Sequence, residues 1–155
     1  MYRKILVPLD GSELSECSLE PLRALTTSGN ITEVIILRVL EPMHSQTLAA
    51  LSEAGGTLLK EIEDNRGKEA KHYIQNIATK LQNEGIKAEP IMIPGNPGDV
   101  ILNYAKSNNV DLIIMSTHGR SGISRWVMGS VTNKVLNHSP IPVLIIIPKG
   151  CRISS

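Results

Sequence analysis

Residues 110–147 read VDLIIMSTHGRSGISRWVMGSVTNKVLNHSPIPVLIII, and this stretch predicts the fold. It begins with a largely apolar run, Val110–Thr117, which is typical of a buried parallel strand. A glycine-bearing loop then leads into a helical pattern over Met128–His138, and a second apolar run follows at Ile141–Ile147. A strand, a crossover helix and a second strand form the repeating unit of α/β proteins, and the crossover is right-handed.

The rest of the chain repeats this alternation of strand and helix signals. Further strands are expected at Lys4–Leu9, Glu33–Leu40 and Lys87–Ile93. Helices are expected at Ser12–Thr27, from Thr57 to a glycine cap at Gly85, and from the Asn96-Pro97 pair to about Asn108. Pro21 predicts a kink or an early break in the first helix. Residues 43–57 are ambiguous between strand and helix, and Gly55-Gly56 marks a break.

Five strands separated by four helical stretches predict an α/β fold, a doubly wound open parallel sheet with helices on both faces. The chain has 155 residues and no linker or repeat, so a single domain is expected. In such sheets ligands bind beyond the carboxyl ends of the strands, at the point where the strand order reverses.

Composition argues against several classes of partner. Sixteen basic and fifteen acidic residues give a net charge of +1, and aromatic residues make up 3% of the chain with no Phe. Neither a basic surface for nucleic acid nor stacking platforms for single strands are therefore expected. No apolar run reaches membrane-spanning length, and Ile5–Leu9 is too short for a signal peptide, so no membrane association is expected. Cys17 and Cys151 are isolated, which favours the reducing cytoplasm.

The last predicted strand indicates how the chain assembles with a second copy. Pro142 cannot donate a hydrogen bond to a sheet, which places Ile141–Ile147 at an edge. Val143–Ile147 is wholly apolar, and an exposed apolar edge pairs readily with another chain. We expect it to pair with its own copy in a symmetric dimer. The alternative is that the tail, Lys149–Ser155, folds back and covers the edge.

The loop after the fourth strand is suited to phosphate. Gly119 and Gly129 let the backbone come close to a ligand, and a helix begins soon after the second glycine. Ser116, Thr117, Ser121 and Ser130 supply hydroxyls. A Walker A loop is excluded because no Gly-Lys-Ser/Thr sequence is present, and the dinucleotide fingerprint is excluded because Asp10-Gly11-Ser12 follows the first strand instead.

Three segments resemble the universal stress protein family: KILVPLDGS near the start, PGNPGDVILNYAKSNNVDLIIM, and LIIMSTHGRSGISRWVMGSVTNKVLNHSPIPVLIII. The resemblance covers residues 1–148, which would form one nucleotide-binding domain, and leaves 149–155 as a short tail. It is weakest across 43–60. It implies a strand order of 3-2-1-4-5 and a dimer through the last strand.

The resemblance also implies a nucleotide site. ATP-binding members resemble G-x-x-G-x9-G-[S/T], and the matching positions here are Ser116, Gly119, Gly129 and Ser130. Ser116 replaces the first glycine, and its hydroxymethyl group could crowd the nucleotide or add a hydrogen bond. The implied contacts are Pro8, Leu9 and Asp10 on the adenosine side, Val39 at adenine, Met115, Ser116, Thr117, His118 and Gly119 beside the ribose and α-phosphate, and Gly129, Ser130 and Val131 at the outer phosphates. Arg120 and Arg125 join this set on charge alone.

The function that follows is a cytoplasmic stress-response regulatory module that binds ATP or AMP, acts as a dimer and signals to an unidentified protein. Mg²⁺ would be held by the phosphates. The four histidines show no metal-ligand spacing. The alternatives are a nucleotide-free dimeric scaffold of the same family, or a slow ATPase or self-phosphorylating protein. No catalytic residue is assigned, since no serine is flanked by a His-acid pair and Asp10 is the only strand-end carboxylate expected.

Overall fold

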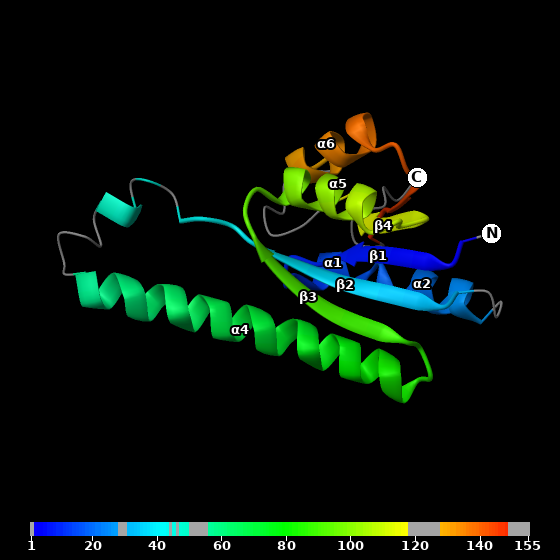
Figure 1. Ribbon diagram of the computed structural model, residues 1–155, viewed down its shortest axis with the longest axis horizontal. Coiled ribbons are helices and arrows are strands. Elements are labelled where there is room, and N and C mark those ends of the chain that lie inside the picture. Colours follow the sequence, from blue (N-terminus) through cyan, green and yellow to red (C-terminus); the bar gives the residue numbers. More distant parts are fainter. Residues whose placement is uncertain are drawn as a thin grey trace, which may run out of the picture.

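The computed structural model describes residues 2–27, 31–43, 45, 47–49, 56–117 and 128–148. Within these residues five strands form one parallel sheet in the order β3-β2-β1-β4-β5, as predicted (Figure 1). The strands are β1 (Lys4–Pro8), β2 (Glu33–Leu40), β3 (Ala88–Pro94), β4 (Leu112–Ser116) and β5 (Val143–Ile146). The helices are α1 (Glu13–Glu16), α2 (Leu19–Thr26), α4 (Gly56–Asn83), α5 (Pro97–Ser107) and α6 (Ser130–His138). None of the described helices combines the length and the apolar character needed to cross a bilayer.

Helices cover both faces of the sheet because successive side chains of a strand point to opposite sides. Ile5, Val7, Ile36 and Ile114 belong to a core cluster with residues of α2 and α4. Their neighbours in the same strands, such as Leu6 and Leu37, belong to a second cluster with residues of α5 and α6. The near-continuous apolar strands of the sequence are thus explained by burial on both faces.

Two sequence-level capping signals are confirmed. Gly85 has φ +83°, and the amide of Ile86 donates to the Leu81 carbonyl at 2.9 Å, which closes α4 in the way a C-terminal glycine cap does. The Asn96 side chain accepts from the Asp99 amide, and Pro97 opens α5.

The first predicted helix, Ser12–Thr27, is wrong in one respect, because it is two helices that separate at Cys17 and Ser18. Serine hydroxyls compete for backbone carbonyls there: Ser18 Oγ donates to Ser15 O at 2.6 Å. Pro21 lies in the first turn of α2, where a missing N–H costs no helical hydrogen bond. The break therefore precedes the proline instead of falling at it.

The edge position of the last strand is confirmed, although β5 is shorter than the predicted Ile141–Ile147. The Pro142 carbonyl accepts from Ile113 of β4 at 3.0 Å, so the proline is paired on the side where it can accept. Leu144 is 37% exposed and Ile147 is 53% exposed.

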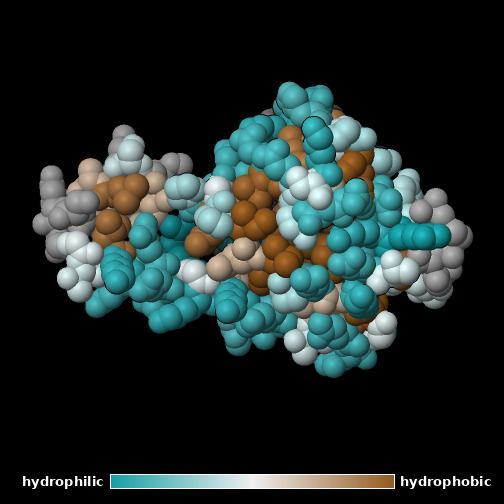
Figure 2. All heavy atoms as spheres, viewed as in Figure 1, coloured by the Kyte–Doolittle hydropathy of each residue, from teal (hydrophilic) through white to brown (hydrophobic). Residues whose placement is uncertain are grey.

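At the opposite edge, Figure 2 shows apolar residues (brown) across the middle of the view, over β2 and β3 and below α5, with polar residues around them.

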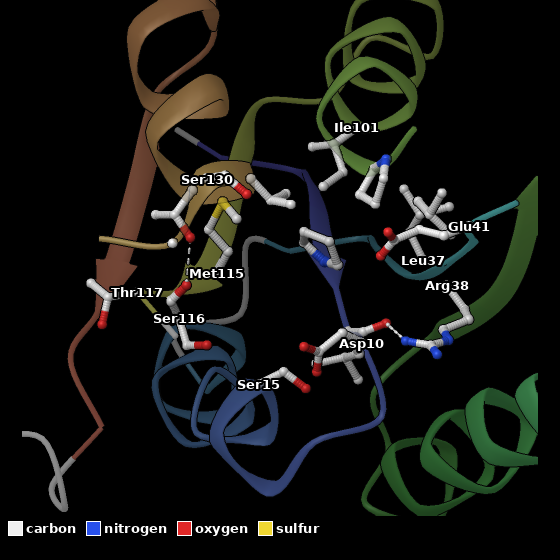
Figure 3. A pocket seen from close by; sticks show the side chains of 17 residues that line it. Asp10, Ser15, Leu37, Arg38, Glu41, Ile101, Met115, Ser116, Thr117 and Ser130 are labelled. Carbon is white, nitrogen blue, oxygen red and sulfur yellow. Dashed lines mark hydrogen bonds between the residues drawn. The ribbon is translucent and has the colours of Figure 1, made fainter. Parts of the chain in front are cut away.

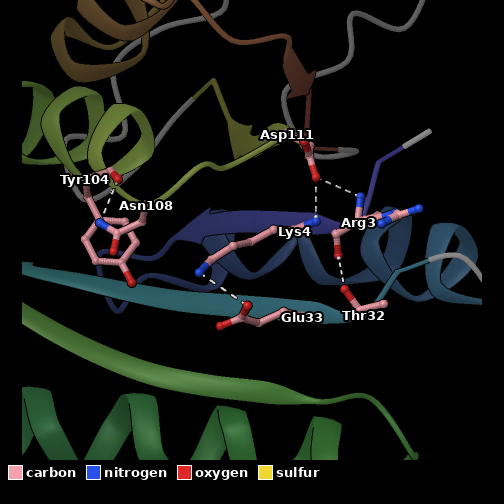
Figure 4. Close-up of polar contacts among 7 residues, drawn as sticks. All are labelled: Arg3, Lys4, Thr32, Glu33, Tyr104, Asn108 and Asp111. Carbon is pink, nitrogen blue, oxygen red and sulfur yellow. Dashed lines mark hydrogen bonds and ion pairs between the residues drawn. The ribbon is translucent and has the colours of Figure 1, made fainter.

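Asp111 anchors β1 at the amino end of the sheet (Figure 4). Its Oδ2 accepts from the backbone amides of Arg3 and Lys4, both at 2.9 Å, just before β4 begins. The hydrogen bonds from the backbone amides of Lys4 and Arg3 lower the pKa of Asp111, and the bond from Lys4 has the larger effect. One carboxylate therefore aligns the start of β1 with the start of β4, its neighbour in the sheet.

We expect Asp111→Ala to lower the free energy of unfolding by about 1 kcal/mol at neutral pH, the scale of a net protein hydrogen bond. Because the folded-state pKa is depressed, the carboxylate's contribution is present above its unfolded pKa and is lost as the pH falls through the folded pKa. Urea unfolding as a function of pH should show the gap between variant and wild type closing below about pH 4.

Asp99→Ala is the matched control, since Asp99 makes an exposed ion pair with Lys134 at 2.7 Å. Such pairs contribute about 0 to 1 kcal/mol. An Asp111→Ala effect no larger than the control's, or one that grows in acid, would contradict the anchoring role.

Candidate functional site

The candidate site is a pocket of about 260 Å³ at the carboxyl ends of β1, β2 and β4 (Figure 3). The strand order reverses between β1 and β4, which is where ligands bind in open α/β sheets. Residues from α1, α5 and α6 complete the wall. The described lining consists of Pro8, Leu9, Asp10, Ser15, Leu37, Arg38, Val39, Glu41, Pro97, Ile101, Met115, Ser116, Thr117, Gly129, Ser130, Val131 and Thr132.

Every described residue of the predicted nucleotide set lines this pocket. These residues are Pro8, Leu9, Asp10, Val39, Met115, Ser116, Thr117, Gly129, Ser130 and Val131. His118, Gly119, Arg120 and Arg125 lie outside the described residues. The structure thus brings together four segments that are far apart in sequence, and their contact with a nucleotide stays a prediction.

The tip of β1 is held by a compact set of hydrogen bonds. The Leu9 amide donates to Leu37 O at 2.9 Å, and Asp10 Oδ1 accepts from Ser12 N at 2.9 Å and from Ser12 Oγ at 2.6 Å. Gly11 has φ +85°, a conformation that glycine adopts without strain. Ser12 in turn caps α1 by accepting from Ser15 N. Asp10 therefore has the turn-forming role that its sequence neighbours indicate, and its carboxylate also lines the pocket.

The opposite wall is formed where β4 meets α6. The Gly129 amide donates to Thr117 O at 3.0 Å, and the buried Thr132 hydroxyl donates to Ser116 O at 3.0 Å. Gly129 is the N-cap of α6 with no side-chain cap, and a Cβ there would lie 3.2 Å from Thr117 O. The first amides of α6 are thereby placed at the pocket, and helix N-terminal amides favour anions.

The lining of the pocket combines different chemistries. Leu37, Val39 and Ile101 supply apolar side chains, and serine and threonine hydroxyls and the start of α6 supply polar groups. Such a mixed lining suits an amphiphilic ligand with a flat ring and an anionic tail.

The prediction missed the rest of the lining, namely Ser15, Leu37, Arg38, Glu41, Pro97, Ile101 and Thr132. Arg38 had a signal in the sequence, because it is the charged residue inside the otherwise apolar run VIILRVL of β2. It is 6% exposed, and its Nη1 donates to Leu9 O at 3.3 Å. The charged groups of the described lining are Arg38, Asp10 and Glu41.

Behind the pocket, Tyr73 joins α4 to α1. Its hydroxyl donates to Glu16 Oε1 at 2.9 Å. Burial raises the pKa of Tyr73, and the hydrogen bond to the Glu16 carboxylate raises it further. The phenol therefore stays protonated at neutral pH and braces α1, whose Ser15 lines the pocket.

The described residues hold no group of three or more His, Cys, Asp or Glu side chains arranged for a metal ion. Within the described lining, the serine and threonine hydroxyls have no histidine beside them to act as a base.

Comparisons with known proteins agree on one family. A family model described as the universal stress protein family matches residues 1–146. A universal stress protein of Methanocaldococcus jannaschii is 32% identical over 155 residues, with 94% of this chain and 95% of that protein covered. One of Bacillus subtilis is 32% identical over 148 residues, with 94% of this chain and 99% of that protein covered.

Solved structures give the same result. The structure of the Methanocaldococcus jannaschii protein matches with a TM-score of 0.80 and 34% identity, covering 96% of this chain and 98% of that one. A universal stress protein of Arabidopsis thaliana with AMP bound matches with a TM-score of 0.67 and 17% identity, covering 99% and 97%. The latter likeness shows a shared fold.

We expect Thr132→Val to loosen the wall between β4 and α6. Valine has nearly the same shape but cannot donate to Ser116 O, so the free energy of unfolding should fall by about 1–2 kcal/mol. Amide hydrogen exchange should show faster exchange at Gly129, whose N–H bond to Thr117 lies next to the lost one.

Thr132→Ser is the matched control because it keeps the hydroxyl. It should leave protection of the Gly129 amide as in the wild type. Equal exchange rates in the two variants would show that the hydroxyl does not hold this wall.

Proposed function

The chain belongs to the universal stress protein family, and we propose that it binds an adenine nucleotide, ATP or AMP, as a dimeric regulatory module of the cytoplasmic stress response. The observation that carries the proposal is the pocket itself. Its lining combines apolar side chains, a strand-end carboxylate and a helix N-terminus, which are groups that a base, a sugar and phosphates would contact.

The adenine would lie against the apolar side chains of Val39 and Ile101. Asp10 would meet the ribose, because a carboxylate accepts hydrogen bonds and ribose hydroxyls donate them. The phosphates would lie at Gly129, Ser130 and Val131, at the start of α6. The Gly129 amide already donates to Thr117 O, so the donors to the anion would be the amides that follow it and the Ser130 hydroxyl. AMP bound to the Arabidopsis thaliana protein is consistent with a nucleotide in this fold.

Mg²⁺ would be carried by the phosphates, since the described residues offer no metal-binding cluster. His118, Gly119, Arg120 and Arg125 would close the site from the loop between β4 and α6. Binding would then act on this loop or on the dimer, and a partner protein would respond to the state that the nucleotide favours.

Ser116 favours a second candidate, a dimeric scaffold without nucleotide. It replaces the first motif glycine, is buried and lines the pocket.

Titration calorimetry with ATP, with and without Mg²⁺, separates the two functions. Binding of ATP at one site per chain with micromolar affinity would support the nucleotide module. No binding heat, no thermal stabilisation and no co-purified nucleotide would support the scaffold. Slow hydrolysis that is lost in Asp10→Ala would add an enzymatic role.

We expect Gly129→Asp to weaken ATP binding by at least about a hundredfold, roughly 2.7 kcal/mol. The new carboxylate would stand at the start of α6, where the phosphates are proposed to lie, and would repel them. Aspartate is a good N-cap, and Gly129 has φ −55° and ψ 149°, which any residue can adopt. The new Cβ would lie 3.2 Å from Thr117 O, so a small local shift is expected, and urea unfolding would check that the variant stays folded.

Gly67→Asp is the matched control, because a Cβ at Gly67 of α4 meets nothing within 4 Å. It should bind ATP as the wild type does. Full ATP affinity in Gly129→Asp would refute the proposed position of the phosphates.

The dimer is proposed to form through β5. Leu144 in this edge strand and Ile147 just after it are exposed, and pairing with a second copy would reduce the exposure of both. Lys149–Ser155, the alternative cover, lies outside the described residues.

We expect Leu144→Lys to convert the dimer to a monomer, since lysine on an edge strand opposes edge-to-edge pairing. Light scattering after size exclusion measures the change. Leu58→Lys is the matched control, because Leu58 is 42% exposed but lies on α4, far from β5. A Leu144→Lys protein that remained a dimer would place the interface elsewhere.

A further inference from the structure

We propose that Arg38 is a positioning residue that lets the pocket distinguish a ribose from a deoxyribose sugar. The inference rests on the proposed function and assigns a role to a residue outside the family motif described above. Arg38 acts through the tip of β1, where it holds the backbone that carries Asp10.

Arg38 is unusual among the residues of β2. Its neighbours Leu37 and Val39 belong to the core cluster under α5 and α6, so the alternation of the strand sends Arg38 to the other face. Arg38 is only 6% exposed, and a buried charged side chain needs strong compensation to be retained. Figure 3 shows it turned toward Asp10, with its hydrogen bond running to the tip of β1.

The bond to Leu9 completes a clamp on that tip. The Leu9 amide donates to Leu37 O, and the Leu9 carbonyl accepts from Arg38 Nη1, so β2 holds both polar groups of the Leu9 backbone. The next residue is Asp10, whose Oδ1 accepts twice from Ser12. The carboxylate is therefore oriented before a ligand arrives, which reduces the ordering cost of binding.

The charge of Arg38 serves the same end. Asp10 and Glu41 both line this part of the pocket, and Arg38 is the cation among the described lining residues. Its positive charge lies on the side of the pocket that holds these two carboxylates. A carboxylate accepts hydrogen bonds and ribose hydroxyls donate them, so a carboxylate in a fixed position strengthens the binding of a sugar whose hydroxyl reaches it. A deoxy sugar that lacks this hydroxyl would lose that contribution.

The position of Arg38 separates this role from phosphate binding. Figure 3 places Arg38 and Ser130 on opposite sides of the pocket, with Asp10 between Arg38 and Ser116. A nucleotide whose phosphates lie at α6 would present its sugar, not its phosphates, near the Asp10 carboxylate. Removal of Arg38 is thus expected to alter recognition of the sugar selectively.

The test is calorimetric titration with ATP, 2′-deoxyATP and 3′-deoxyATP on the full chain. We expect the wild type to prefer ATP over at least one deoxy analogue by about tenfold, the effect of a hydrogen bond to a charged group. Arg38→Met should weaken ATP binding by about tenfold and the binding of that analogue by less than about threefold, so the preference collapses. Arg38→Lys, which can still donate to Leu9 O, should recover part of it.

Two comparisons isolate the mechanism. Arg23→Met is the control, because Arg23 pairs with Glu84 at the opposite end of the sheet and should leave all three affinities unchanged. Asp10→Asn should also abolish the preference, and the double variant should lose no more than Asp10→Asn alone, since coupled residues are not additive. Thermal unfolding of each variant confirms that it is folded.

The outcomes are distinct. Binding of no nucleotide by the wild type would refute the proposed function, and this inference with it. Binding by the wild type with an unchanged sugar preference in Arg38→Met would overturn the inference alone. Equal losses for ATP and both analogues, or losses that add to those of Asp10→Asn, would also overturn it, because Arg38 would then support the pocket without setting its selectivity.

Discussion

Burial of both faces of the sheet constrains everything else in this molecule. Ile5 and Leu6 are neighbours in β1, point to opposite sides and are both fully buried. A polar side chain has almost no place in such strands except at their ends, where backbone and helix termini can satisfy it. Polar side chains that could bind a ligand are therefore confined to the ends of the strands. The pocket lies at the carboxyl ends of β1 and β4, where the strand order reverses.

This constraint explains how much could be predicted. A strand that must be apolar on both faces is easy to recognise, and β2 was predicted with its observed bounds. The tips were also predictable, because Asp10 and the Gly129-Ser130 pair directly follow or precede apolar segments. Residues 118–127 lie outside the described part of the chain, so the loop members of the predicted set stay predictions.

What was missed has several causes. The separation of α1 from α2 depends on side-chain hydrogen bonds to the backbone. Ser15 Oγ donates to Ser12 O, and Ser18 Oγ donates to Ser15 O. Arg38 was not predicted as a site residue, because a single charged residue does not change the prediction of a buried strand from an apolar run. Ile101 lines the pocket only because α5 crosses the sheet at that place. The place of Ile101 belongs to tertiary geometry, which composition and periodicity do not encode, whereas the serine hydrogen bonds are local and Arg38 had a signal in the sequence.

The position of β1 has a consequence for biosynthesis. It is the central strand, yet its partner β4 is distant in sequence, with Ile5 paired to Leu112. At about 5–20 residues per second, the ribosome would need about 5–20 s to make the intervening chain. During that interval β1 and β2 can pair with each other but lack their far neighbour. Such non-local pairing slows folding, and the apolar edge of β1 is a natural place for a chaperone to act on the nascent chain.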